Sequence, residues 1–378
     1  MIKKLIPVSI VCCICIFVIL CSNLIFEQDF LPDKINRDVQ YYKAKVIEVI
    51  EENLQPDEVH QEFLLGRQEL RIQFIDGPFK GEEYNLTNYL SRLYNIMAQE
   101  SSELVIACYI QNNKISEMSI YTYHRINFIV ALLLIFFTLI ILIGKFKGLK
   151  SVISLIFTGT LVIYLMLPLM LRGIEPICAA LIVVILSTIV TLGLVSGCSK
   201  KTLNAIIGTI SGVLIATLIA YIFGKLTNLS GATMAETEPL LYVSETSGLK
   251  IRGLLFAGIL IASLGAVMDV AMSISSALYE FIDVNPNISA KKLIQSGMNV
   301  GTDMIGTMTN TLILALAGSS LNNFILIFSA DMDNAQMLNM DTLTVELLQG
   351  LAGSIGIVLT VPITVIVGYL LYHKQISK

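Results

Sequence analysis

The stretches GAVMDVAMSIS at residues 265–275 and SGMNVGTDMIGTMTNTL at residues 296–312 each place one aspartate among apolar and small residues. An ionised carboxylate in hydrocarbon costs about 2.5–3.5 kcal/mol on insertion scales, so such a residue is seldom there without a role. On helices, each aspartate would share a face with small polar residues. These are Ser273 with Asp269, and Asn299, Thr307 and Asn310 with Asp303. We expect the two polar faces to lie at the same depth on consecutive helices and to line a path or an ion site.

The composition around these stretches is that of a membrane protein. The chain has 378 residues, a mean hydropathy of +0.75 and 14% charged residues, against roughly 25% in soluble domains. No basic stripe with interleaved aromatic residues suggests a nucleic-acid partner. No Walker A sequence occurs, so energy for any transport would come from a gradient or another chain. We therefore predict an α-helical integral membrane protein whose immediate partner is the lipid bilayer.

Apolar segments of bilayer length predict about eight transmembrane helices. They lie near residues 5–26, 126–143, 152–171, 174–196, 203–223, 253–275, 298–317 and 350–371. The apolar character breaks at Gly318-Ser319-Ser320 and resumes near residues 324–328. This pattern predicts either a bent helix or a helix that ends at Gly318 before a short interfacial segment.

The distribution of charge predicts the orientation, because cytoplasmic loops carry an excess of Lys and Arg. With both termini in the cytoplasm, the predicted cytoplasmic loops carry Lys145, Lys147, Lys150, Lys200, Lys201, Lys291 and Lys292. The predicted outer loops carry Glu236, Glu238, Glu245, Asp331, Asp333 and Asp341. Lys225, Lys250 and Arg252 fall at outer helix ends and oppose the pattern.

Residues 27–124 are more polar and predict a small β-rich domain outside the cytoplasm. Alternation predicts strands near residues 41–52, 69–74, 104–110 and 117–123, and residues 88–97 suggest a short helix. We expect a barrel-like or sandwich fold. The predicted organisation is a transmembrane helix at 1–26, the β-rich domain at 27–124 and a seven-helix domain at 125–378. The first helix is read as uncleaved, with a cleaved signal peptide as the alternative.

The seven cysteines do not form a disulfide framework or a zinc motif. Four of them lie in the first apolar segment, and Cys108 stands alone in the polar region. We therefore expect buried small side chains, no cofactor and no assigned metal.

With these two stretches and this general plan, the chain resembles the YibE/F family of bacterial membrane proteins. The resemblance implies a multi-pass protein of the bacterial cytoplasmic membrane and gives no substrate. Tyr123-His124-Arg125 is similar to an acidic and aromatic motif of that family but lacks the acid.

These residues favour a secondary transporter or permease for an unknown small solute or ion. Asp269 and Asp303 could supply oxygens to a hard cation or carry a proton, and a partner membrane protein or a second copy could complete the assembly. The simplest alternative is that each aspartate caps a helix or lies near the cytoplasmic headgroups, one or two turns from the helix end. A third class is a non-transporting envelope anchor. An intramembrane aspartyl protease also uses two aspartates, but its G-x-G-D motif is absent from Val300-Gly301-Thr302-Asp303, so we expect no enzyme.

Overall fold

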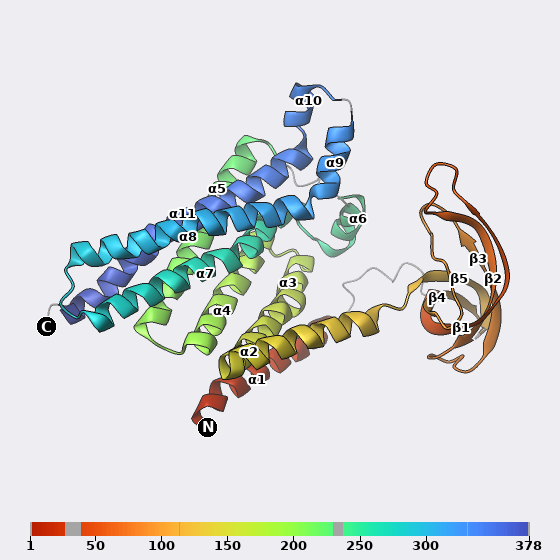
Figure 1. Ribbon diagram of the computed structural model, residues 1–378, viewed down its shortest axis with the longest axis horizontal. Coiled ribbons are helices and arrows are strands. Elements are labelled where there is room, and N and C mark those ends of the chain that lie inside the picture. The colour runs from red at the N-terminus through yellow and green to blue at the C-terminus, as the bar shows by residue number, and fades with distance from the viewer. Residues whose placement is uncertain (1, 27–38, 113, 230–236, 331, 377–378) are drawn as a thin grey trace. The chain divides into compact units, whose positions relative to one another are not determined.

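The computed structural model is mostly helical, with one antiparallel sheet formed by residues in the first third of the sequence (Figure 1). It describes residues 2–26, 39–112, 114–229, 237–330 and 332–376. The chain divides into two compact units. The helical unit comprises Met1–Leu31 with Ile140–Lys378, and the sheet unit comprises Pro32–Leu139.

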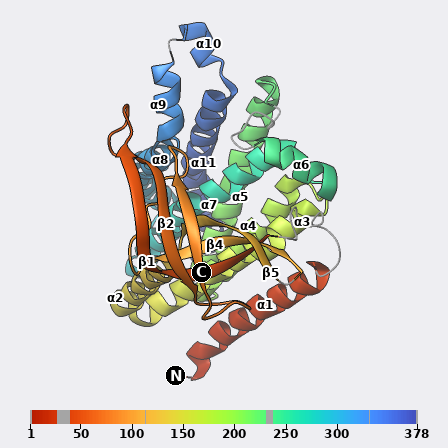
Figure 2. The same ribbon diagram turned by 90° about the vertical axis from the view of Figure 1, so that its right-hand side faces the viewer.

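The sheet unit is built on five antiparallel strands in the order β3-β2-β1-β4-β5. They are β1 (Val39–Pro56), β2 (Leu64–Phe74), β3 (Glu83–Leu90), β4 (Glu103–Gln111) and β5 (Lys114–Tyr123). The long β1 pairs with both β2 and β4, and its register against β2 shifts twice between Val46 and Glu51. Such bulges increase strand twist and bending. The outer strands β3 and β5 contact each other, so the sheet curls into a partly open barrel (Figure 2).

The predicted helix at residues 88–97 is wrong. β3 continues to Leu90, and an irregular segment follows it. The buried Gln68 side chain accepts a hydrogen bond from the Ala98 N–H group and donates one to the Ala98 carbonyl, at 3.0 and 3.1 Å. The Asn88 amide donates to the Ile96 carbonyl at 2.8 Å. Side chains of the sheet therefore satisfy backbone groups that a helix would have used internally.

An ion pair between the buried Asp57 and the exposed Arg92 holds the turn between β1 and β2. The Asp57 Oδ1 atom accepts hydrogen bonds from the backbone N–H groups of Val59 and His60, at 2.7 and 2.9 Å. Arg92 Nη2 lies 3.0 Å from the same oxygen, and Arg92 Nε pairs with Oδ2. The Arg92 guanidinium and the backbone donors hold the pKa of the Asp57 carboxyl well below its usual range. The pair thus links the β1–β2 turn to the segment after β3.

Helices account for most of the remaining chain (Figure 1). In chain order they are α1 (Ile2–Phe26), α2 (Ile126–Leu161), the π-helical turn η1 (Val162–Met166), α3 (Leu167–Leu171), α4 (Pro176–Ser196), α5 (Lys200–Leu226), α6 (Thr237–Ser247), the 3-10 turn η2 (Ile251–Gly253), α7 (Leu254–Val284), α8 (Ala290–Ser319), α9 (Leu321–Ser329), α10 (Asn334–Leu338) and α11 (Asp341–Ile376).

Five helical stretches among the described residues are long and apolar enough to cross a membrane. They are Ile126–Leu171, Pro176–Ser196, Lys200–Leu226, Ile251–Val284 and Asp341–Tyr372. The first contains non-helical backbone at Lys145 (φ 49°, ψ −128°), between the two apolar segments predicted there. α8 and α9 are bent by 63°, which confirms the predicted break, and they make a sixth candidate if they form one span. The count of about eight spans stays a prediction.

α5, α7 and α11 form the centre of the helical unit through close contacts of small residues. A Cβ atom added at Gly212 of α5 would lie 1.8 Å from Thr360 Oγ1 of α11 and 2.8 Å from Val267 Cγ1 of α7. One added at Gly208 would lie 2.2 Å from Thr364 Oγ1. Only glycine permits this approach of the backbones, which is typical of helix packing inside membranes.

α8 lies against α7 and α11 along a second pair of glycines. A Cβ atom at Gly301 would lie 2.2 Å from the Val361 side chain, and one at Gly297 would lie 2.8 Å from the Leu278 side chain. These two glycines are one helical turn apart and both are buried, so they define the inner face of α8.

We expect Gly212→Ala to destabilise the helical unit by about 1–3 kcal/mol, because the added methyl group overpacks a filled contact. The measurement is the midpoint of thermal unfolding in detergent, followed by circular dichroism. Gly193→Ala is the matched control, since a Cβ atom at Gly193 meets nothing within 4 Å. An equal loss in both variants would contradict the assigned packing role.

We expect Asp57→Asn to loosen the β1–β2 turn, because Arg92 loses its counter-ion. Hydrogen exchange of the amides in residues 57–63, measured by mass spectrometry, should become faster. In the wild-type protein the same change should appear below about pH 3.9, the ordinary carboxyl value. The direction follows from the lowered pKa of Asp57 in the folded protein. The ion pair stabilises the fold at pH values above the ordinary carboxyl pKa, and this stabilisation is lost as Asp57 becomes protonated at lower pH. Glu58→Gln removes a charge from an exposed neighbour and should leave exchange unchanged.

Candidate functional site

α7 presents a small and polar face opposite its buried one. Asp269 and Ser273 are both exposed, one helical turn apart. The opposite face is buried among α5, α8 and α11, and it includes Val267, Val270, Ala271 and Ile274. The predicted sharing of a face by Asp269 and Ser273 therefore holds.

α8 likewise has one buried face and one exposed polar face. Its polar side chains Asn299, Asp303, Thr307 and Asn310 are all exposed. The inner face carries Leu293, Gly297, Gly301 and Leu312, which are buried. We call Asp269, Ser273, Asn299, Asp303, Thr307 and Asn310 the polar surface of the helical unit.

The two aspartates lie at matched depth on neighbouring helices. α7 and α8 contact each other and are joined by a short turn, so they run in opposite directions (Figure 1). Asp269 lies 15 residues before Val284, the end of α7, and Asp303 lies 13 residues after Ala290, the start of α8. At about 1.5 Å per residue, both are roughly 20 Å from the turn.

This depth excludes a role as helix caps for the two aspartates. The N-cap of α8 is Ser289, whose hydroxyl accepts a hydrogen bond from the Lys292 N–H group at 3.4 Å. Both aspartates lie more than three turns inside their helices, beyond the reach of the end effects that favour acids near a helix start. The alternative that each aspartate caps a helix is therefore wrong.

The hydrogen-bonding capacity of the polar surface is largely unused. The Thr307 hydroxyl donates to the Met304 carbonyl of its own helix at 3.1 Å. Within the described part of the chain, the side chains of the other five residues make no hydrogen bond or ion pair with one another or with any other residue. The same part contains no group of three His, Cys, Asp or Glu side chains able to hold a metal ion. The structure places the six predicted residues on the exposed faces of α7 and α8, but it does not join them in an enclosed site.

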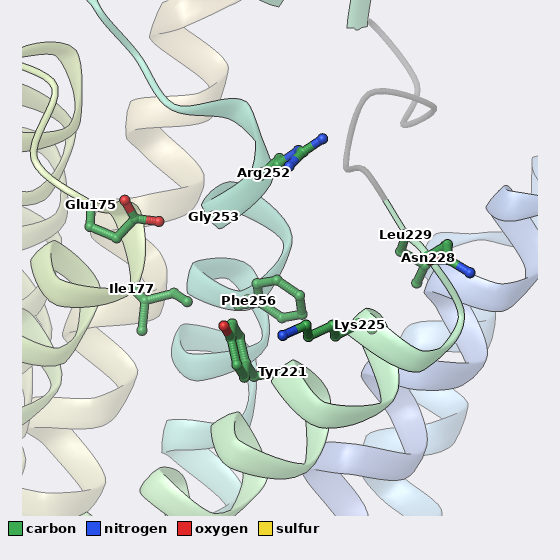
Figure 3. Close-up of a pocket in the computed structure, with 10 residues that line it drawn as sticks. Glu175, Ile177, Tyr221, Lys225, Asn228, Leu229, Arg252, Gly253 and Phe256 are labelled. Carbon is green, nitrogen blue, oxygen red and sulfur yellow. The ribbon is translucent and has the colours of Figure 1, made fainter.

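A pocket of about 390 Å³ lies elsewhere in the helical unit, among the ends of α4, α5 and α7 (Figure 3). Its lining includes Glu175 and Ile177 at the start of α4, and Tyr221 and Lys225 near the end of α5. It also includes Arg252 of η2 and Phe256 of the first turn of α7. None of the six residues of the polar surface contributes to it.

The acidic side chain at this pocket has an ion-pair partner, whereas two of the basic side chains there have none among the described residues. Glu175 pairs with Lys250, with Oε2 and Nζ 3.3 Å apart. Lys225 and Arg252 have no ion-pair or side-chain hydrogen-bond partner among the residues that the structure describes. The Tyr221 and Phe256 rings lie edge to face, with centroids 5.8 Å apart.

The sequence contained one signal for this pocket. Lys225, Lys250 and Arg252 are the cations that opposed the predicted charge pattern of the loops. Cations that oppose the loop pattern need a local reason. Lys225 and Arg252 line the pocket, and Lys250 pairs with Glu175 of its lining. Glu175 carried no such signal, because its contact with Lys250 joins residues far apart in the chain.

Three comparisons with known proteins bear on identity. No curated protein matches the chain. No solved structure matches it either. A family model described as YibE/F-like protein matches residues 132–374, which include α7, α8 and the whole polar surface. The match covers more than half of the sequence and agrees with the resemblance carried by the two aspartate stretches. The chain belongs to the YibE/F-like family.

Proposed function

We propose that this protein is a membrane permease that moves a small solute or ion, with Asp269 and Asp303 exchanging a proton or cation. The observation that carries the proposal is the matched depth of two unpaired carboxylates on adjacent apolar helices. Carboxylates inside a bilayer are costly, and in transporters they mark ion paths and proton relays. Coupling through them requires no nucleotide site.

The chemistry of the polar surface suits weak and reversible binding. Two carboxylates, two amides and two hydroxyls offer oxygen ligands of the kind that hard cations prefer. Without a cation, like charge on two nearby carboxylates favours protonation of one of them. A site that alternates between these states can couple a gradient to movement of a second solute.

The proposal includes a location and an orientation. We propose the bacterial cytoplasmic membrane, with both termini in the cytoplasm and the sheet unit outside. The argument rests on the lysine-rich loops before α5 and α8 and on the acidic segments around α6 and α10. Family membership is consistent with this location.

We further propose that a second copy of the chain covers the polar surface. The inner faces of α7 and α8 are used by contacts within the helical unit, so the polar surface points away from its core. Lipid cannot satisfy amides and carboxylates. A two-fold axis beside α8 would place the same polar residues of two copies against each other, with water or ions between them.

Proton and cation flux into proteoliposomes should be measurable for the wild-type protein and should fall to background in Asp269→Asn and Asp303→Asn. An amide keeps the size of the side chain but cannot bind and release a proton. Asp283→Asn is the matched control, because this exposed acid lies near the cytoplasmic end of α7. Circular dichroism should show that all variants are folded.

Two results would contradict this permease mechanism. One is the absence of wild-type flux across a broad panel of cations and pH gradients. The other is flux that persists unchanged in both aspartate variants, which would favour an envelope anchor.

The second copy is tested by cross-linking. In a background without native cysteines, Asn310→Cys should give a dimer with a short bismaleimide reagent in membranes. Ser263→Cys, at a buried position of α7, should not. A dimer from neither variant would argue against the covered surface, whereas a cross-link to another protein would identify a different partner.

A further inference from the structure

The pocket in Figure 3 has the size and position of a binding site. Its volume of about 390 Å³ lies within the range of about 300–1,000 Å³ found for small-molecule sites. Three helix ends meet there, so its walls belong to packed elements of the helical unit.

The unpaired charges at the pocket are positive. The Glu175 carboxylate is already balanced by the Lys250 ammonium. Lys225 and Arg252 stay unpaired among the described residues. Figure 3 shows the Lys225 side chain extending toward Tyr221 and Phe256, and the Arg252 side chain extending outward from the rim on another side of the pocket. An anion at this rim would therefore lie between cations from α5 and η2.

The start of α4 adds donors for an anion. α4 begins at Pro176, and its N-cap residue Glu175 makes no side-chain hydrogen bond to the helix. The start of α7 is different, because the Leu254 N–H group already donates to the Ile251 carbonyl of η2. The first N–H groups of a helix are unsatisfied within the helix and lie at the positive end of its dipole. Such ends bind phosphates and carboxylates readily.

The rest of the wall is apolar and close-packed. Phe256 is buried, and Ile177 packs beside it in the same small cluster. Gly224 is required there, since a Cβ atom would lie 2.7 Å from the Phe256 ring. The pocket thus combines a cationic rim with an apolar floor, which suits an anionic group attached to a carbon chain.

We propose that this pocket binds a phosphate group carried by an anionic lipid headgroup or by a soluble phosphate ester. Phosphate is favoured because the planar Arg252 guanidinium can donate to two oxygens while the Lys225 ammonium donates to another. The site contains no residue of the polar surface, so it stands or falls independently of the permease mechanism.

The test uses the full-length protein, purified in detergent. The soluble probes are inorganic phosphate and glycerol 3-phosphate, titrated by calorimetry. The lipid probe is dioleoylphosphatidylglycerol, followed by native mass spectrometry, with dioleoylglycerol as the phosphate-free lipid. The double variant Lys225→Gln/Arg252→Gln should weaken binding by at least about tenfold. The matched control is Lys291→Gln/Lys292→Gln, which removes two cations at the start of α8, outside the pocket lining.

A third variant should bind phosphate more tightly than the wild type. Glu175→Gln leaves Lys250 without its partner and adds net positive charge, so it should tighten phosphate binding. Raising the ionic strength from about 0.1 M to about 1 M shortens the Debye length from about 10 Å to about 3 Å. It should therefore weaken binding in the wild type more than in the double variant.

Binding of the lipid probe alone would assign the site to a headgroup, and competition by glycerol 3-phosphate would assign it to a soluble ester. Either result supports the phosphate site. Equal binding by the two double variants, weaker binding in Glu175→Gln, or no binding of any probe by the wild type would overturn it. Thermal unfolding shows whether a loss of binding reflects misfolding, and Glu175→Gln keeps the test decisive because it predicts a gain.

Discussion

The close approach of α5 to α7 and α11 is the constraint on which the helical unit depends. In a bilayer, helices gain little from hiding apolar surface from each other, so contact distance and hydrogen bonds decide their packing. Gly208 and Gly212 let the hydroxyl groups of Thr364 and Thr360 occupy space that any side chain on α5 would fill. The buried Asn204 amide donates to Ser275 of α7 at 2.9 Å and adds a polar link to the same centre. The position of α8 follows from this centre, because Gly297 and Gly301 fit the surface that α7 and α11 create together.

This arrangement explains why the polar surface is open. The glycine face of α8 has to turn inward to reach Val361 and Val365, and a helix that buries one face must present the opposite one outward. Asn299 and Asp303 lie on that opposite face. The packing that stabilises the unit and the exposure of its acids are therefore two results of one sequence pattern. The second copy proposed above would cover those acids.

Helical periodicity made the polar surface predictable, whereas contacts between distant segments could not be read in advance. The spacing of Asn299, Asp303, Thr307 and Asn310 fixes a common helix face whatever the tertiary structure. The strand β3 is hard to predict because its polar residues obscure the alternation and favour a helix start at Asn88. Only the fold brings Asn88 beside Gln68 and Ile96, where its amide is satisfied. The sequence marks the cations near the pocket as exceptions to the charge pattern, but only the fold brings them beside Glu175.

The strand order of the sheet unit has a consequence for engineering. Tyr123, where the chain leaves the sheet, pairs with Leu104, which in turn pairs with Ala44 near the start of β1. With strands about 4.8 Å apart, Tyr123 lies about 10 Å from Ala44. The chain enters β1 at Val39, five residues earlier, so entry and exit lie roughly 20 Å apart. The family match begins at residue 132, beyond the last strand. A reporter domain whose own termini lie at a similar separation could therefore replace the sheet between α1 and α2.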